Sequence, residues 1–496
     1  MTVVERGTAS RGPATVGLDD ALRALRASPG GDGAGPAPRL VAATCAAPAL
    51  DPIALFAAAR ELDLEAALLV GPSDGLALVG IGRAWAAEAS GPGRFQAAAA
   101  AWATLAGRAR VAPEDLPRGV GPVLVGGLGF TGRPPADAAW APFGALSLVL
   151  PELVFARTRG GAFVTAAIMT DGGPGDDAGD RSGDTAAPGR LARRWEHLAA
   201  RASALAPAPG AVAARPVVHD LVVAAERPDR VRWDRTVGLY AGAVGRGRLD
   251  KVVLARRVEV AGPTQLDSVN ALRRLAASAP ESTLYAFGRG DRTFLGATPE
   301  RLVRTEGREF ATVAVAGSIR RGADAAEDAG LAARLLADEK EREEHGVVVE
   351  MLRASLAPIV ERLEVGRSPA VLPLRHVSHL VTQVAGRLRE RAGILALAER
   401  LHPTPAVGGE PRDLALELID EHEGFDRGWY AGPVGWLGAD GDGELVVALR
   451  CGNVAGRTAV LFAGCGIVAD SDPEREWEES RAKLRTVASA LGWLEP

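Results

Sequence analysis

Two glutamate-rich segments that lie far apart in the chain place the strongest constraint on its fold. One lies in a predicted long helix over 324–363, whose apolar residues recur at spacings of three or four. The same spacing passes through Glu341 and Glu344. The predicted final helix repeats this arrangement with Glu476 and Glu479. Both pairs therefore fall on inward faces, where a carboxylate needs a partner or a cation.

Two interpretations of these glutamates remain open. Acidic runs usually mark wet helix faces, so a solvated charge run is the first. In the second, the two Glu-x-x-Glu pairs hold one hard divalent cation. Ligation by oxygen alone, with neither His nor Cys, suggests Mg²⁺, with waters and an anionic substrate completing the shell. Spacing alone does not choose between them.

The second half of the chain carries the clearest strand patterns, with β-branched residues and alternating polarity. An ADGDG turn at 439–443 is typical of a hairpin, and we expect the last three strands to form one antiparallel meander. Asp472 and Pro473 begin the final helix as its cap and first residue. The predicted strands are 251–260, 283–290, 293–305, 309–318, 428–438, 444–453 and 457–470.

The first half has weaker signals. Residues 1–38 are predicted to form a mobile tail, and the low-complexity stretch 171–190 an exposed loop. An N-terminal part over 39–215 is followed by a part over 216–496 that carries the candidate site. Together the patterns predict an α/β (α+β) fold with much antiparallel sheet. The remaining predicted elements are helices at 51–64, 94–108 and 189–206 and strands at 122–130 and 145–157.

Two ionisable residues stand at strand ends in the second half. Lys251 begins the strand 251–260 with a parity opposite to its apolar residues, so it points either into a polar cleft or into water. Glu300 follows a strand within GATPERL. It is either a general acid, if burial raises its pKa, or an ordinary carboxylate at a helix start.

Other residues have a structural and a functional interpretation. His379 is more often a satisfied core histidine than a catalytic one. Arg450, expected in mid-strand, needs a carboxylate from the protein or from a ligand. The glycines of FAGCGIV, at 462–468, would allow the backbone to approach a small anion closely.

Composition excludes several classes of protein. The 496 residues carry a net charge of −5, and no basic run indicates nucleic acid or a membrane surface. Three cysteines are too few for a disulfide framework, which fits a reducing cytoplasm. No apolar run approaches the roughly 18 residues that span a bilayer.

A set of short motifs in one order resembles the chorismate-utilising enzymes, which include isochorismate, salicylate, anthranilate and aminodeoxychorismate synthases. The similarity is dense over 230–496 and sparser upstream. It implies a large two-sheet α/β sandwich, like anthranilate synthase component I, that encloses the active site. The motifs are KVVLAR, GATPERL, VAGS, DEKEREEH, HVSHLVT, HPTPAVGG, WYAGPVG, FAGCGIV and PEREWEESRAKL.

The resemblance also implies a role for each candidate residue. Glu344 and Glu479 match Mg²⁺ ligands, and Glu341 and Glu476 match their water-bridging neighbours. Lys251 matches the base that activates water, and Glu300 acts as the acid. The positions implied to bind or line the substrate are Gly317, Ser318, His379, Thr404, Ala406, Tyr430, Arg450, Gly464 and Lys483.

The subfamily depends on the nucleophile. Isochorismate and salicylate synthases have a lysine where Lys251 stands, and the aminodeoxychorismate type has a lysine where this chain has Ala316. The resemblance therefore implies an isochorismate synthase, in which Lys251 activates water for attack at C2 and Glu300 protonates the departing C4 hydroxyl. Salicylate synthase is the alternative. Chorismate is the expected small-molecule partner, with no amidotransferase subunit and a monomer or weak dimer.

Overall fold

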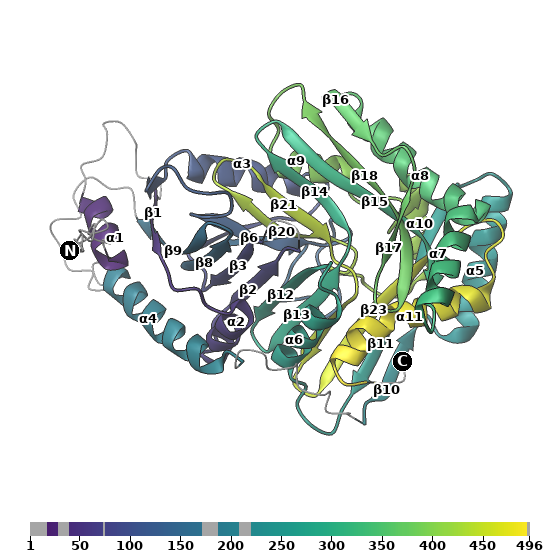
Figure 1. The fold of residues 1–496 in the computed structure, drawn as a ribbon, viewed down its shortest axis with the longest axis horizontal. Helices are drawn as coiled ribbons and strands as arrows, with labels where there is room; N and C mark the ends of the chain where they lie inside the picture. The colour runs from purple at the N-terminus through teal and green to yellow at the C-terminus, as the bar shows by residue number, and fades with distance from the viewer. Residues whose placement is uncertain (1–16, 28–38, 73–74, 171–186, 208–219, 494–496) are drawn as a thin grey trace, which may run out of the picture.

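The computed structural model describes residues 17–27, 39–72, 75–170, 187–207 and 220–493. Two large twisted sheets dominate it (Figure 1). Most of the predicted tail and most of the predicted 171–190 loop lie outside the described residues. Within these ranges no helix is long and apolar enough to cross a membrane.

The larger sheet has thirteen strands among the described residues, in the order β10-β11-β23-β22-β13-β12-β2-β3-β8-β9-β1-β5, with β19 beside β11. Its strands from the first half are β1 (Arg39–Ala46), β2 (Ala66–Val70), β3 (Ala77–Ile81), β5 (Arg110–Ala112), β8 (Leu153–Thr158) and β9 (Gly161–Thr170). Those from the second half are β10 (Val222–Arg227), β11 (Lys251–Ala261), β12 (Thr283–Arg289), β13 (Arg292–Thr298), β19 (Gly409–Glu410), β22 (Cys451–Ala455) and β23 (Thr458–Ile467).

The smaller sheet has ten strands among the described residues, in the order β16-β18-β15-β14-β21-β20-β6-β7-β4, with β17 beside β18. Both sheets combine strands from the two halves of the chain, because β2 pairs with β12 and β6 pairs with β20. The strands are β4 (Trp85–Glu88), β6 (Val123–Leu128), β7 (Leu146–Leu150), β14 (Arg301–Glu306), β15 (Glu309–Arg320), β16 (Val360–Val365), β17 (Ala370–Pro373), β18 (Val377–Leu388), β20 (Pro433–Gly438) and β21 (Gly443–Val447).

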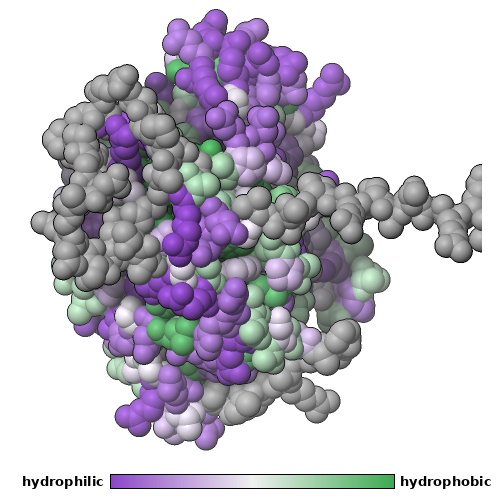
Figure 2. Space-filling view, turned by 90° about the vertical axis from the view of Figure 1, so that its left-hand side faces the viewer, coloured by the Kyte–Doolittle hydropathy of each residue, from purple (hydrophilic) through white to green (hydrophobic). Residues whose placement is uncertain are grey.

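Helices cover the outer faces of the sheets. Apolar residues of α2, α4, α6 and α11 pack on the outer face of the larger sheet, and a second apolar core lies between the two sheets. The face that carries α1 and α4 mixes hydrophilic residues with smaller hydrophobic areas (Figure 2). The helices are α1 (Leu18–Ala27), α2 (Pro52–Glu61), α3 (Arg94–Ala106), α4 (Ala187–Leu205), α5 (Arg230–Gly245), α6 (Ser268–Ser278), α7 (Ala325–Ala337), α8 (Glu339–Leu356), α9 (Ile394–Leu401), α10 (Arg412–His422) and α11 (Pro473–Ala490).

The predicted fold class is confirmed, and so is the start of the final helix. Asp472 caps α11 by accepting a hydrogen bond from the Arg475 amide, and Pro473 is its first residue. The predicted helix over 324–363 is wrong as one element. Asp338 adopts an extended conformation and caps a new helix through the Glu341 amide, which divides the segment into α7 and α8. Its last residues belong to β16 instead.

The predicted single meander over 428–470 is also wrong, because its strands belong to different sheets. β20 and β21 form a hairpin in the smaller sheet, whereas β22 and β23 form one in the larger sheet. The connection between them, at Ala448–Arg450, crosses from one sheet to the other. Arg450 therefore lies at a crossover rather than in mid-strand, and its φ of 50° places it in the left-handed region.

Candidate active site

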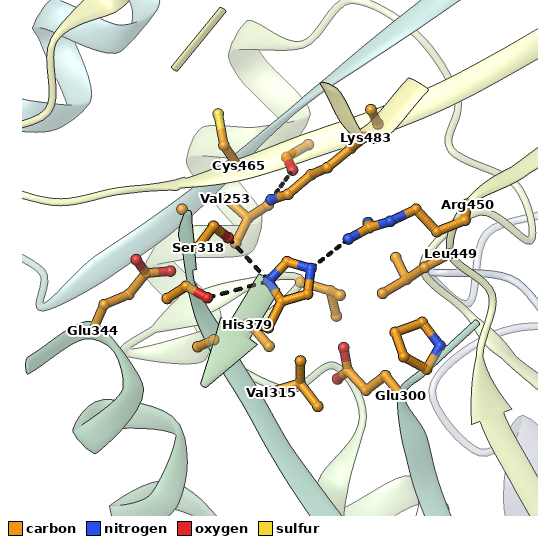
Figure 3. A pocket seen from close by; sticks show the side chains of 18 of the residues that line it. Val253, Glu300, Val315, Ser318, Glu344, His379, Leu449, Arg450, Cys465 and Lys483 are labelled. Atoms are coloured by element: carbon orange, nitrogen blue, oxygen red, sulfur yellow. Dashed lines mark hydrogen bonds between the residues drawn. The ribbon is translucent and has the colours of Figure 1, made fainter. Parts of the chain in front are cut away.

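A cavity of about 50 Å³ lies between the two sheets, close to α8 and α11. Strands β11 and β23 line it from the larger sheet, and β15 and β18 line it from the smaller (Figure 3). It gathers eleven of the predicted site residues, which are Lys251, Glu300, Gly317, Ser318, Glu344, His379, Ala406, Tyr430, Arg450, Gly464 and Lys483. Thr404, Glu341 and Glu479 do not line the cavity but each contacts a residue that does, and Glu476 lies one turn before Glu479 on α11.

Lys251 is buried at the start of β11, with 1% of its side chain exposed, so the alternative that it points into water is wrong. Its Nζ donates a 2.7 Å hydrogen bond to Glu344 Oε1 on α8. Gly466 on β23 makes this contact possible. A Cβ there would lie 2.3 Å from Lys251 Cε and 2.7 Å from Glu344 Oε1. Gly466 belongs to the FAGCGIV motif, but only Gly464 of that motif was among the predicted site residues.

Glu300 lies in the turn between β13 and β14, so the alternative of a helix start is wrong. It is 3% exposed, and burial raises the pKa of its carboxyl to about 7. The charges of Lys251, Arg450 and Lys483 oppose this rise. So does Thr404, whose Oγ1 donates a 3.4 Å hydrogen bond to Glu300 Oε1. Such a carboxyl can keep its proton near neutral pH.

His379 on β18 links the cavity wall to Arg450. Burial and the charge of Arg450 lower the pKa of His379 to about 3, so the ring is neutral. Arg450 Nη2 donates to His379 Nε2 over 2.7 Å. The hydrogen must therefore be on Nδ1, which lies 3.1 Å from the Gly317 carbonyl and 3.0 Å from Ser318 Oγ (Figure 3). His379 thus orients the guanidinium rather than carrying a charge of its own.

Tyr430, Gly464 and Lys483 form a second part of the wall. Tyr430 stacks on Phe462 with ring centroids 5.1 Å apart. A Cβ at Gly464 would lie 3.0 Å from both the Leu254 carbonyl oxygen and Tyr430 Oη, so only glycine leaves this space open. Lys483 Nζ donates to the Gly464 carbonyl over 2.9 Å.

The four glutamates lie on α8 and α11 and each has a partner. Ser318 N donates to Glu341 over 2.6 Å, and Lys251 donates to Glu344. Ser471 Oγ donates to Glu476 over 2.8 Å, and Lys340 lies 3.6 Å from the same oxygen. Lys483 Nζ lies 2.6 Å from Glu479 Oε1. Among the described residues, no three acidic, His or Cys groups lie close enough together to hold a metal ion in this structure.

The electrostatics of these carboxylates nevertheless fit a cation. Burial and the neighbouring Glu344 raise the pKa of Glu341 to about 7. Burial and Glu479 do the same for Glu476. Glu479 keeps a pKa below its ordinary value, because Lys483 outweighs its burial. The acidic groups repel one another across the two helices, and a donor set made of carboxylate oxygens suits a hard divalent ion.

The comparisons with known proteins agree with this arrangement. A family described as "Chorismate binding enzyme" matches residues 30–492. The chain belongs to the chorismate-binding enzymes. The match begins well before residue 230, where the motifs become dense, so the N-terminal strands belong to the same family unit.

Among curated chorismate-binding enzymes, the salicylate biosynthesis isochorismate synthase of Pseudomonas aeruginosa is 37% identical over 461 residues, which is 92% of each chain. Isochorismate synthase MenF of Bacillus subtilis is 35% identical over 382 residues, or 75% of each chain. Among solved structures, the menaquinone-specific isochorismate synthase MenF of Escherichia coli gives a TM-score of 0.73 at 26% identity and covers 96% of this chain and 98% of its own.

Proposed function

We propose that this chorismate-binding enzyme is an isochorismate synthase. The observation that carries the proposal is the pairing of Lys251 and Glu300 in one cavity, both buried, with Glu300 able to keep a proton near neutral pH. An acid and a base with separate roles are what a displacement of hydroxyl by water requires. The relatives that carry this name support the same conclusion.

In the proposed reaction, Lys251 takes a proton from a water molecule while the water oxygen attacks C2 of chorismate. The ring double bonds shift, and the C4 hydroxyl leaves as water with the proton of Glu300. One water enters and one leaves, so substrate and product are isomers. A proton then returns from Lys251 to Glu300 and resets the pair. No ammonia is used, so the proposal needs no amidotransferase subunit.

The substrate carboxylates would be held by cations and donors of the wall. Arg450, oriented by the neutral His379, is a buried positive group that needs a negative partner, and Lys483, which is paired with Glu479, adds a second positive charge near it. Chorismate-binding enzymes are generally Mg²⁺-dependent. Glu344 and Glu479, with Glu341 and Glu476 behind them, would hold that ion here, and it would neutralise the ring carboxylate.

The test is incubation of the protein with chorismate and Mg²⁺, with and without EDTA, followed by chromatography. Isochorismate should be the main product, and EDTA should abolish its formation. Lys251→Ala and Glu300→Gln should each lower kcat by about 10²–10⁴-fold. Salicylate and pyruvate as the main products would replace the proposal with salicylate synthase. Near wild-type turnover by both variants would refute the two assigned roles.

A further inference from the structure

An ion pair outside the predicted site is among the most deeply buried charges of the described residues. Glu423 caps the C-terminal end of α10, and Arg427 follows it in the loop that leads to Tyr430. Their side chains are 1% and 3% exposed. Arg427 Nε donates to Glu423 Oε2 over 2.8 Å, and Nη2 contacts Oε1 of the same carboxylate. The contact is a two-point, fork-like pairing.

This pair fills a gap in the larger sheet at the edge of β11. β19 pairs with β11 at Lys251 and Val252, and β10 pairs with it only from Arg257 onward. Between them the edge has no neighbouring strand. Arg427 Nη2 donates to the Val253 carbonyl over 3.0 Å, and the Ala255 amide donates to Glu423 Oε1 over 2.8 Å. The ion pair therefore takes the place of a strand beside the segment that follows Lys251.

The same guanidinium reaches the loop between α9 and β19. Arg427 Nη1 donates to the Val407 carbonyl over 2.7 Å, and Gly408 O accepts from the Val253 amide over 2.8 Å. This loop also carries Thr404, whose hydroxyl bonds Glu300. The arginine lies over the Phe130 ring at 4.2 Å from its centroid, which completes its burial. One side chain thus joins the segment of the proposed base to the loop that touches the proposed acid.

Stability alone does not account for such a pair. Burying two charges is costly, and apolar residues of similar size often replace a buried ion pair without loss of stability. What they cannot replace is three directional hydrogen bonds, from Arg427 to the Val253 and Val407 carbonyls and from the Ala255 amide to Glu423, which join β11 to the 402–408 loop. The pair sets the position of β11 relative to the 402–408 loop, in the way that supporting groups behind an active site hold the reacting residues in place.

We propose that Glu423 and Arg427 form a positioning pair that fixes Lys251 relative to Glu300 across the active cavity. The inference rests on the proposed function. Neither residue touches the reacting atoms. Arg427 acts through the backbone of β11 and of the 402–408 loop, and Glu423 acts through the Ala255 amide of β11.

The test compares the Glu423→Gln/Arg427→Met double variant with wild type. The double substitution leaves no unpaired buried charge and keeps an acceptor for the Ala255 amide. It removes the hydrogen bonds that Arg427 donates to the Val253 and Val407 carbonyls. Misplacement by about 1 Å can cost about 10²-fold, so we expect kcat to fall by 10- to 100-fold while KM for chorismate changes less. Arg289→Met is the matched control, because Arg289 on β12 is a 5% exposed arginine whose hydrogen bonds and ion pair go to neither β11 nor the 402–408 loop. Its partner Glu65 still has Arg83 as a second partner in this variant.

A pH profile separates positioning from a general loss of structure. The charges that face Glu300 are those of Lys251, Arg450 and Lys483, and Thr404 supplies its hydrogen bond. If the 402–408 loop moves, that bond is lost and Glu300 holds its proton more tightly. The descending limb of kcat/KM should therefore move to higher pH in the double variant and stay in place in Arg289→Met.

Arg427→Lys keeps the charge but cannot make all the bonds of the guanidinium, so it should fold and show an intermediate kcat. If the double variant does not fold, the kcat of Arg427→Lys tests the inference by itself. The inference would be overturned if a folded double variant kept the wild-type kcat and the wild-type pH of the descending limb of kcat/KM. It would also be overturned if Arg427→Lys kept the wild-type kcat. Absence of chorismate turnover in the wild-type protein would instead refute the proposed function.

Discussion

At the scale of single residues, burial prepares the site for chemistry. Glu300 has a pKa of about 7 against an ordinary value of 4.5, so folding favours its protonated form. Stability is unaffected below pH 4.5 and falls as pH rises from 4.5 to 7, because the unfolded chain gives up this proton first. Above pH 7 the cost is about 3 kcal/mol. The carboxyl is retained despite this cost, which is typical of a functional acid.

Glu300→Gln should therefore separate activity from stability. Glutamine cannot donate a proton to the leaving group, so kcat should fall by about 10²-fold or more. The variant should also be more stable than wild type at pH 8 by up to about 3 kcal/mol and equally stable near pH 4.5. Denaturant unfolding at the two pH values measures this. A variant that is less stable than wild type at pH 8 would show that the ionised Glu300 carboxylate does not destabilise the folded protein.

In the wild type, kcat/KM should decline above pH 7, because Glu300 then loses the proton that it is proposed to donate.

Gly466→Ala tests the space that the Lys251 contact requires. The new methyl group would overlap Lys251 Cε and Glu344 Oε1, so one of them must move. We expect about a 10²-fold loss of kcat with a stability loss of about 1–3 kcal/mol. Gly238→Ala on α5 is the control, because nothing lies within 4 Å of a Cβ there. An active Gly466→Ala enzyme would mean that the Lys251 side chain can work from another position.

The positions of some of these residues could be predicted from the sequence, and those of others could not. The strand parity of Lys251 left two directions open, because its burial depends on Gly466 of β23 and on α8, which are distant in sequence. The roles of Thr404 and Ala406 came only from the family resemblance. Nothing local in the sequence showed that Glu423 and Arg427 would fill a gap beside β11.

At the scale of elements, helix periodicity predicted α8 and α11 but not how they are held. Asp338 competes as a cap within the acidic run, so a pattern based on spacing alone misses the break between α7 and α8. Arg256 on β11 fixes α11. Its guanidinium lies 3.3 Å from the Trp477 ring centroid, and its Nη1 donates to Ser480 Oγ over 2.6 Å.

Arg256→Met should loosen α11, which carries Glu476 and Glu479. Supporting groups of this kind change metal affinity by about 10–100-fold, so we expect at least a tenfold rise in the Mg²⁺ concentration for half-maximal activity. The kcat at saturating Mg²⁺ should change less. Arg481→Met, in a more exposed pair with Glu478 on the same helix, should leave the Mg²⁺ requirement unchanged. Equal Mg²⁺ requirements in the two variants would contradict this role of Arg256.

At the scale of the whole molecule, the two halves share both sheets. The pairings β2–β12 and β6–β20 join them, and the apolar core between the sheets draws on both. The fold class could be predicted from strand and helix patterns. The assignment of β20–β21 and β22–β23 to different sheets could not, because consecutive hairpins in a sequence look the same whether or not they share a sheet.

A fragment of residues 220–496 should therefore not fold as a soluble unit. Removing the first half would expose the edges of β12 and β20 and one side of the core, and exposed apolar edge strands associate. Size-exclusion chromatography should show aggregates, and chorismate turnover should be absent, whereas the full chain serves as the control. A monodisperse, active fragment would show that the catalytic strands fold without the first half.

The crossover at Ala448–Arg450 has one further consequence. The guanidinium that is proposed to bind the substrate sits on one of the connections between the two sheets, at a residue with a left-handed backbone conformation. A shift of one sheet against the other would move this residue relative to His379 on β18 and so disturb the hydrogen bond between them. The proposed binding of the substrate acid therefore depends on the relative position of the two sheets.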